Sequence, residues 1–357
     1  MRLIINILVA LLAVFMFSCK EKEDNITQTT KQPQGYTPTP YQLNLPQHFP
    51  QMPLPMDNPL TEEGVELGRY LFYEKKLSGD NTMSCGSCHK PDAGFSDDRQ
   101  FSIGIDGMQG NRQAMPIVNL GYAQKFFWDG RSNSLTEQAL EPVRDPIEFH
   151  ENWVNAVSEL QADPLYPPMF EKAFGTSTID SILVAKAIAQ FELTMISGNS
   201  KFDQWIKREV AFTTDELNGY NLFNALGGGD CLHCHGGTLT TDHSFQNNGL
   251  DEFLTDLGLG AVTGDPSDNG KFKVPSLRNI ALTAPYMHDG RFNTLDEVID
   301  FYSTGVHANS PNISPNMEFA ADGGVNLTPQ EKVELKAFLL TLTDTSFINN
   351  PDFQDPH

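Results

Sequence analysis

Apolar residues recur every three to four positions in three parts of the chain, a period that predicts amphipathic helices. The first helix is expected from Thr61 onward and the second over residues 181–197. Their apolar faces would be Val65, Gly68, Leu71 and Phe72 in the first, and Ile182, Ala185, Ala189, Leu193 and Ile196 in the second. The third, over residues 333–342, follows residues 328–331 (TPQE), which combine an N-cap threonine, a proline and a capping-box glutamate. The alternation typical of strands is not found, so we expect a mainly α fold with long loops.

The two ends of the chain are expected to lie outside the folded domains. Residues 1–19 have the pattern of a signal peptide, in which Arg2 precedes a short apolar run and Cys19 follows a serine as in a lipoprotein cleavage site. Residues 20–58 are polar and rich in proline, glutamine and threonine, which predicts a flexible tether, and residues 346–357 are expected to form a C-terminal tail. We therefore expect a periplasmic protein that is held at a membrane only by lipid on Cys19, with simple secretion as the alternative.

The chain carries 46 acidic and 24 basic residues, a formal net charge of −22. Such an excess of negative charge argues against nucleic acid as a partner and favours a basic one, such as a small cationic electron carrier. The alternative explanation is that the acidity only keeps an exported protein soluble.

The most specific chemical signal is a repeated Cys-x-x-Cys-His motif, at residues 85–89 (CGSCH) and 231–235 (CLHCH). This pattern is typical of c-type haem attachment, in which two thiols bind the porphyrin and the histidine ligates its iron. The residues that would hold two covalent haem c groups are Cys85, Cys88, His89, Cys231, Cys234 and His235. A thioredoxin-like redox pair or half of a zinc site fits less well, because the histidine, the repetition and the export signal all favour haem.

The sequence that follows each motif is also repeated. Asn119 is followed nine residues later by WDGR, beginning at Trp128, and Asn279 is followed nine residues later by HDGR, beginning at His288. The repeat predicts two tandem c-type-cytochrome-like haem domains, over residues 59–200 and 201–345, in which Trp128 and His288 occupy equivalent positions.

Taken together, these motifs resemble those of the bacterial dihaem cytochrome c peroxidases and their MauG-type relatives. The resemblance covers nearly all of the chain from about residue 59 and includes LGR at 67–69, FWDGR at 127–131, VPSLRN at 274–279 and PYMHDGR at 285–291. In that family the N-terminal haem meets peroxide and the C-terminal haem takes in electrons. The resemblance therefore implies an enzyme whose peroxidatic haem domain is residues 59–200 and whose electron-transfer haem domain is residues 201–345.

The resemblance implies roles for three residues of the first domain. Trp128 matches a tryptophan between the two haems and would bridge them, although a core tryptophan is the simpler alternative. Glu148 matches a catalytic glutamate, since a carboxylate in an apolar pocket has a raised pKa that suits proton transfer between the two oxygens of peroxide. Gln138 matches a glutamine that lines the same pocket.

Ile105 departs from the family pattern, because well-known members have a histidine there that closes the sixth site of the peroxidatic iron. Isoleucine cannot ligate iron, so this haem is expected to be five-coordinate or water-bound, as in MauG-type members. His150 lies two residues beyond Glu148. As a ligand, however, His150 would block the site that Glu148 is expected to serve.

A second departure concerns the haem of residues 231–235. Typical peroxidases ligate this iron with a methionine at the position of Tyr302, whereas MauG-type proteins use a tyrosine. A phenolate favours ferric iron, so the potential of this haem should be low. The alternative ligands are Met317 and His307, with Tyr302 as a core aromatic.

A calcium ion between the domains is also implied by the resemblance. Family members bind it through an asparagine side chain and two backbone carbonyls, at positions that correspond to Gln113, Thr283 and Pro285. Gln113 keeps an amide oxygen, which calcium accepts as a ligand.

Three functions follow from these features. The first is a peroxidase that reduces hydrogen peroxide to water with electrons from a small donor such as cytochrome c or a copper protein. The second is a MauG-like enzyme that oxidises side chains of a partner protein through a high-valent dihaem state. The third, a dihaem electron carrier without enzymatic activity, fits least well because Ile105 leaves one iron open. The resemblance also allows a homodimer.

Overall fold

The computed structural model describes residues 36–357, and these residues are mainly helical with a single pair of two-residue strands. This confirms the mainly α fold that was predicted from the sequence. The helices are α2 (Glu62–Tyr73), α3 (Cys85–Cys88), α4 (Leu135–Arg144), α5 (Trp153–Ala162), α6 (Tyr166–Phe174), α7 (Ser181–Thr194), α8 (Lys201–Ile206), α9 (Thr214–Asn224), α10 (Leu232–His235), α11 (Leu259–Thr263), α12 (Leu295–Thr304), α13 (Pro329–Leu340) and α14 (Thr345–Ile348). The strands β1 (Phe245–Gln246) and β2 (Phe272–Lys273) pair antiparallel.

Short 3₁₀ helices complete the regular structure. They are η1 (Lys75–Leu77), η2 (Pro91–Ala93), η3 (Leu120–Tyr122), η4 (Pro266–Asp268), η5 (Ile280–Leu282), η6 (Ala320–Asp322) and η7 (Pro351–Phe353).

Helix ends follow the capping residues that the sequence contains. The Thr61 side chain accepts a hydrogen bond from the backbone N–H of Gly64 and starts α2, and Thr328 forms the predicted capping box at the start of α13. Helix α7 differs from its prediction, because it ends at Thr194 and is buried on nearly all sides rather than along one face. Ile182, assigned to its buried face, is 47 % exposed. The physical reason is that α7 packs against both α2 and α4, so helical periodicity could not identify a single apolar face.

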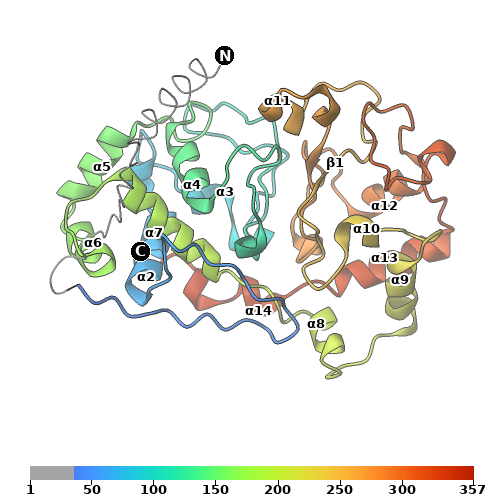
Figure 1. Cartoon of the computed structure of the whole chain (residues 1–357), viewed down its shortest axis with the longest axis horizontal. Helices are drawn as coiled ribbons and strands as arrows, with labels where there is room; N and C mark the ends of the chain where they lie inside the picture. The colour runs from blue at the N-terminus through green and yellow to red at the C-terminus, as the bar shows by residue number, and fades with distance from the viewer. Residues whose placement is uncertain (1–35) are drawn as a thin grey trace, which may run out of the picture. The chain divides into compact units, whose positions relative to one another are not determined.

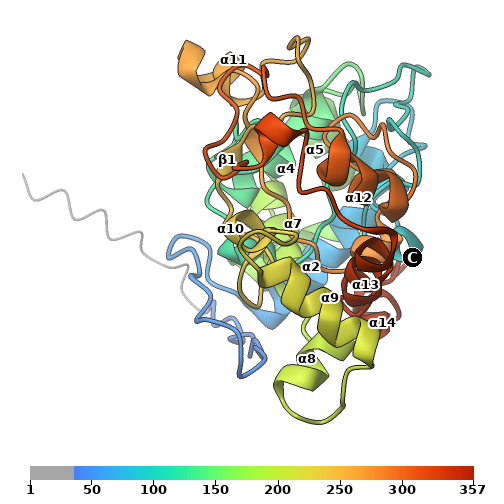
Figure 2. The ribbon, with the colours of Figure 1, turned by 90° about the vertical axis from the view of Figure 1, so that its right-hand side faces the viewer.

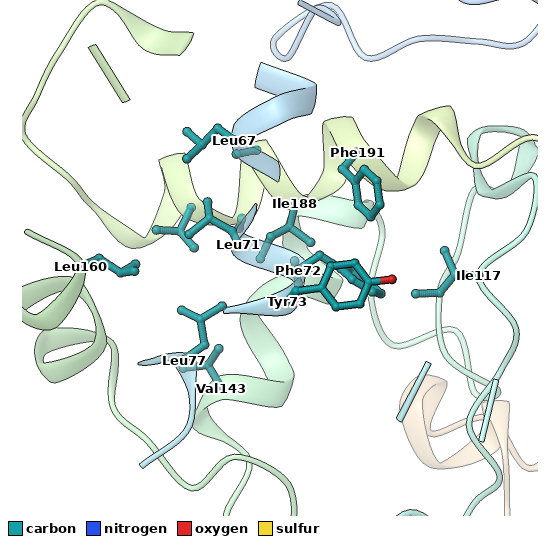
Figure 3. Packing of buried hydrophobic residues seen from close by; sticks show 14 of the residues in the cluster. Leu67, Leu71, Phe72, Tyr73, Leu77, Ile117, Val143, Leu160, Ile188 and Phe191 are labelled. Carbon is teal, nitrogen blue, oxygen red and sulfur yellow. The ribbon is translucent and has the colours of Figure 1, made fainter. Parts of the chain in front are cut away.

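The first hydrophobic core lies between α2 and α7 and is closed by side chains from α4 and α5 (Figure 3). Leu67, Leu71 and Phe72 of α2 meet Ile188 and Phe191 of α7 in this core. The two helices approach closely because Gly68 has no side chain. A Cβ atom at Gly68 would lie 1.9 Å from the carbonyl oxygen of Ala187.

The second core is built in the same way from α9 and α13, which pack side by side (Figure 2). Gly219 of α9 is equivalent to Gly68, because it allows the close approach of the two helices. A Cβ atom at Gly219 would lie 1.9 Å from the carbonyl oxygen of Glu334 in α13. Phe223 and Phe338 join the two helices in this core. Each half therefore packs the helix that precedes its Cys-x-x-Cys-His motif against the last long helix of that half.

The internal repeat in the sequence is also a repeat of backbone conformation. Asn119 and Asn279 both adopt a left-handed conformation, with φ of 54° and 61°, and each begins a 3₁₀ helix. Gly130 and Gly290 of the two DGR segments have φ of 73° and 62°. Helices α4 and α12 follow these segments at equivalent positions.

The same two asparagines hold the junction between the halves. The Asn119 side chain exchanges two hydrogen bonds of 3.0 Å with the backbone of Ser197, and Asn279 donates to the hydroxyl of Ser197 at 3.1 Å. Asn279 also accepts the backbone N–H of Asp344 at 2.7 Å. One asparagine from each half of the repeat therefore bonds to the same connecting segment, at Ser197.

Both ends of the described chain pack against the folded body. Residues 36–58, expected to belong to the tether, bury Phe49 and Met52, and His48 bonds to Asp203 at 2.6 Å. Residues 346–357, expected as a tail, return to the first core, where Phe347 and Phe353 are buried, and the C-terminus lies among the helices of the first half (Figure 1). The contacts include His48 with Asp203, 155 residues away, and the backbone oxygen of Phe353 with the Tyr73 hydroxyl, 280 residues away.

Within residues 36–357, no helix is long and apolar enough to cross a membrane. The expected signal peptide and Cys19 lie outside the described residues.

The close contact of α2 with α7 predicts the effect of adding one methyl group. We expect Gly68→Ala to destabilise the protein by about 1–3 kcal/mol, because the new Cβ overlaps a backbone oxygen that cannot move without shifting α7. The denaturant midpoint of the purified holoprotein measures this change. Glu66→Ala, at an exposed position of the same helix, serves as the control and should leave the midpoint nearly unchanged. Equal stability of Gly68→Ala and the parent would contradict the packing described here.

Candidate functional site

The first Cys-x-x-Cys-His motif forms the short helix α3, and His89 follows directly after it. Nδ1 of His89 lies 3.0 Å from the backbone oxygen of Phe95, a contact that favours the tautomer with the proton on Nδ1 and the metal-binding lone pair on Nε2. Burial lowers the pKa of His89, so the imidazole is neutral, as a metal ligand must be. Cys85 and Cys88 are free thiols one helical turn apart, in the arrangement that haem attachment requires.

The second motif repeats this geometry. Nδ1 of His235 lies 3.2 Å from the backbone oxygen of Thr240, and burial lowers the pKa of His235 as well. Cys231, Cys234 and His235 line a largely apolar cavity of about 1750 Å³, a volume that includes space open to solvent. A flat macrocycle with two thiol attachments and one imidazole ligand fits the donor set and the walls of this cavity.

Glu148 lies in a loop that folds back along α4, the helix that carries Gln138. The backbone N–H of Glu148 donates to the backbone oxygen of Asp145 at 3.1 Å. The backbone N–H of the next residue, Phe149, donates to the carbonyl oxygen of Pro142 in α4. Burial, reinforced by the nearby carboxylate of Asp145 and opposed by Arg131, raises the pKa of Glu148 to about 7. A carboxyl group with this pKa exchanges protons at neutral pH, which is the property expected of a general acid–base.

Ile105 is placed directly against this loop. Its backbone N–H donates to the carbonyl of Glu148 at 3.0 Å. Gly104 permits the contact, because a Cβ atom there would lie 1.9 Å from the carbonyl oxygen of Ile147. His150 is exposed, and its ring nitrogen Nδ1 bonds to a carboxylate oxygen of Asp106.

Trp128 is 8 % exposed and lies on the wall of the cavity of the second motif, although it belongs to the first half of the chain. Its indole Nε1 donates to the backbone oxygen of Gln113 at 2.8 Å, and the backbone N–H of Gln113 donates to the oxygen of His288 at 2.8 Å. The ring of His288 stacks on Phe272 with a centroid separation of 3.7 Å. Trp128 is therefore fixed at the contact between the two halves.

Tyr302 of α12 and Met317 both line the cavity of the second motif, whereas His307 is exposed and is not among the lining residues. The phenol oxygen of Tyr302 accepts a hydrogen bond of 2.9 Å from the amide of Asn248. Burial raises the pKa of Tyr302 to about 12, and the Asn248 bond partly offsets this effect. The geometry brings two of the three candidate ligands, Tyr302 and Met317, to the same cavity as His235.

The three residues implied for calcium border the same cavity. Gln113, Thr283 and Pro285 all line this cavity. The side-chain nitrogen of Gln113 donates to the hydroxyl of Ser96 at 2.7 Å, which turns the amide nitrogen of Gln113 toward Ser96. The amide oxygen and the two backbone carbonyls are the hard oxygen donors that calcium prefers.

Sequence reasoning missed two residues that hold this region together. Arg112 forms a bidentate pair with Asp256 at 2.8 and 2.9 Å and also binds Asp129 of the DGR segment. Asn248 contacts Tyr302, as described above. No periodic or motif signal marks Arg112 or Asn248, because their partners lie 144 and 54 residues away along the chain.

Comparison with known proteins gives a consistent picture. The sequence model of the di-haem cytochrome c peroxidase family matches residues 62–211. The methylamine utilization protein MauG of Methylorubrum extorquens is 37 % identical over 296 residues, which cover 82 % of this chain and 81 % of that protein. The cytochrome c551 peroxidase of Nitrosomonas europaea is 35 % identical over 312 residues, which cover 86 % of each chain.

Solved structures show the same fold. A MauG-like protein associated with microbial copper homeostasis superposes with a TM-score of 0.81 and 38 % identity, over 88 % of this chain and 99 % of that one. The diheme peroxidase BthA of Burkholderia thailandensis superposes with a TM-score of 0.70 over 84 % of this chain and 91 % of that one; at 22 % identity this likeness concerns the fold alone.

The raised pKa of Glu148 predicts a pH-dependent stability. The folded pKa of about 7 exceeds the usual value of 4.5, so folding favours the protonated carboxyl. The parent should lose stability relative to Glu148→Gln as the pH rises from about 4.5 to about 7, by about 3 kcal/mol in total.

Denaturant unfolding of both proteins at pH 5 and pH 8 measures this difference. Glu171→Gln, at an exposed position of α6, is the control and should follow the parent at both pH values. A constant gap between Glu148→Gln and the parent from pH 5 to pH 8 would show that Glu148 has an ordinary pKa.

Proposed function

Because this chain belongs to the di-haem cytochrome c peroxidase family, which includes MauG, we propose that it reduces hydrogen peroxide to water with electrons from a small exported donor. The family is one of oxidoreductases, and the chain accordingly carries two haem c groups. The observation that supports peroxide reduction is Glu148, a largely buried carboxyl with a pKa of about 7 in a loop bonded to the backbone of Ile105.

The reaction consumes one hydrogen peroxide, two electrons and two protons and yields two waters. When bound, the haem groups supply the iron that meets peroxide and the store from which the electrons come. Glu148 would take the proton from the near oxygen of peroxide and return it to the far oxygen, which then leaves as water. Gln138 would orient the peroxide from α4, and Ile105 would keep the approach free of a competing protein ligand.

Electrons are proposed to enter at the second haem and to cross at Trp128. The position of this indole on the wall of the second cavity, held by Gln113, supports the assignment. The net charge of −22 supports a basic donor, such as a cytochrome c or a copper protein. Tyr302 is proposed as the second ligand of the iron held by His235, and a calcium ion is proposed at Gln113, Thr283 and Pro285.

A second candidate function is oxidation of side chains on a partner protein, as in a MauG-like enzyme. Two residues favour it specifically, namely Ile105 in place of a histidine and Tyr302 in place of a methionine. Relatives named MauG and relatives named cytochrome c peroxidase match this chain about equally well, so both activities stay open to experiment. Export, with a lipid at Cys19, is proposed for either function.

Steady-state consumption of peroxide with a reduced cytochrome c tests the proposal. The parent should turn over continuously, and Glu148→Gln should be about 10²- to 10⁴-fold slower because it lacks the group that transfers the proton. The exposed control Glu171→Gln should retain parental turnover. Negligible turnover by the parent, together with a long-lived change of the haem spectrum after peroxide is added, would favour the MauG-like function instead.

A further inference from the structure

The phenol oxygen of Tyr302 has a polar partner that the family motifs do not include. The side-chain nitrogen of Asn248 donates to this oxygen at 2.9 Å. The amide is oriented for this role, because its oxygen accepts the backbone N–H of Leu250 at 3.2 Å. With the oxygen held by Leu250, the NH₂ group of Asn248 is the end that faces the phenol.

The bond from Asn248 is the one hydrogen bond of the Tyr302 phenol oxygen among the described residues. Within residues 36–357, no other hydrogen bond involves the phenol oxygen of Tyr302, so its hydrogen has no protein acceptor there. A buried tyrosine hydroxyl usually donates a hydrogen bond to the protein. Here the phenol oxygen instead accepts one, and both side chains line the cavity that contains His235.

The position of Asn248 is set by the contact between the two halves. It follows β1, which pairs with β2, and the backbone N–H of Lys273 in β2 donates to the backbone oxygen of Trp128 at 2.8 Å. Asn248 thus lies two residues beyond a strand whose partner strand bonds to the backbone of Trp128. Its amide is itself held by the bonds to Leu250 and Tyr302, so that it can act as a fixed donor.

We propose that Asn248 is a positioning residue that aims the phenolate oxygen of Tyr302 at the second iron and raises the reduction potential of that haem. The inference rests on the proposed ligation by Tyr302. An N–H group directed at an anionic oxygen stabilises negative charge on it. Ferrous iron withdraws less electron density from a phenolate ligand than ferric iron does, so the phenolate oxygen would be more negative in the reduced state. The hydrogen bond from Asn248 would therefore stabilise the reduced state more than the oxidised one.

The test uses the purified dihaem holoprotein with Asn248→Leu, which keeps the size of the side chain and removes the donor, and Asn248→Asp, which replaces the donor by an acceptor. We expect the ferric-to-ferrous ratio of the second haem at a fixed solution potential to rise by roughly tenfold in Asn248→Leu, because a hydrogen bond to a charged group is lost. A tenfold change corresponds to about 59 mV in a one-electron titration. Asn248→Asp should shift the ratio further in the same direction.

Two controls make the result interpretable. Asn218→Ala, which removes an exposed amide of α9, should leave the potential of the second haem unchanged. Tyr302→Phe tests the ligation itself through the resting absorption spectrum, and intact mass shows that each variant carries two haems. If one Asn248 variant fails to load, the other still measures the effect.

The possible outcomes separate the inference from the proposal that it rests on. An altered spectrum in Tyr302→Phe with parental potentials in both Asn248 variants would overturn the role of Asn248 while keeping the ligand. A methionine–iron band in the parent would overturn ligation by Tyr302, and the role of Asn248 with it. A graded fall in potential from parent to Asn248→Leu to Asn248→Asp, with the parental absorption spectrum otherwise retained, would support the inference, since a merely structural defect would not follow the charge of the substituent.

Discussion

The backbone of one residue, Gln113, joins the two halves of the chain. Its carbonyl oxygen accepts the indole N–H of Trp128 at 2.8 Å, and its N–H donates to the oxygen of His288 at 2.8 Å. Trp128 and His288 are equivalent positions of the internal repeat, so this bridge spans the place where the two halves meet. A displacement of Gln113 would change the position of Trp128 relative to the second cavity, and the bond of the Gln113 side chain to Ser96 at 2.7 Å opposes such a displacement.

A symmetric backbone supports two unequal sites. Both histidines of the Cys-x-x-Cys-His motifs direct Nδ1 at a backbone oxygen, and both halves pack two helices across a glycine. The differences lie in the side chains placed beside each motif. The first half presents Glu148 beside the non-ligating Ile105, whereas the second presents Tyr302 with Asn248. The two sites therefore differ in the individual side chains that loops and helices place beside each motif, while the repeated scaffold is shared.

The sequence predicts the scaffold well, because its features are local. Capping residues place the starts of α2 and α13, and the repeat spacing anticipates the paired left-handed asparagines Asn119 and Asn279. Contacts between distant segments are not predictable in this way. The return of Phe353 to the first core and the bond between Asn248 and Tyr302 join residues whose own neighbourhoods are polar or unremarkable, so only the folded chain shows them.

Burial raises the pKa of two titratable side chains, Glu148 and Tyr302, with different consequences for each. It raises the pKa of Glu148 to about 7, so this carboxyl gains and loses a proton at neutral pH and suits transfer between oxygens. It raises the pKa of Tyr302 to about 12, so this phenol keeps its proton unless a cation replaces it. Ligation by Tyr302, as proposed above, would therefore have to overcome this effect of burial, and the N–H of Asn248 at the phenol oxygen would help to do so. The same desolvation thus gives Glu148 an exchangeable proton near neutral pH and keeps the Tyr302 phenol neutral in the absence of a cation.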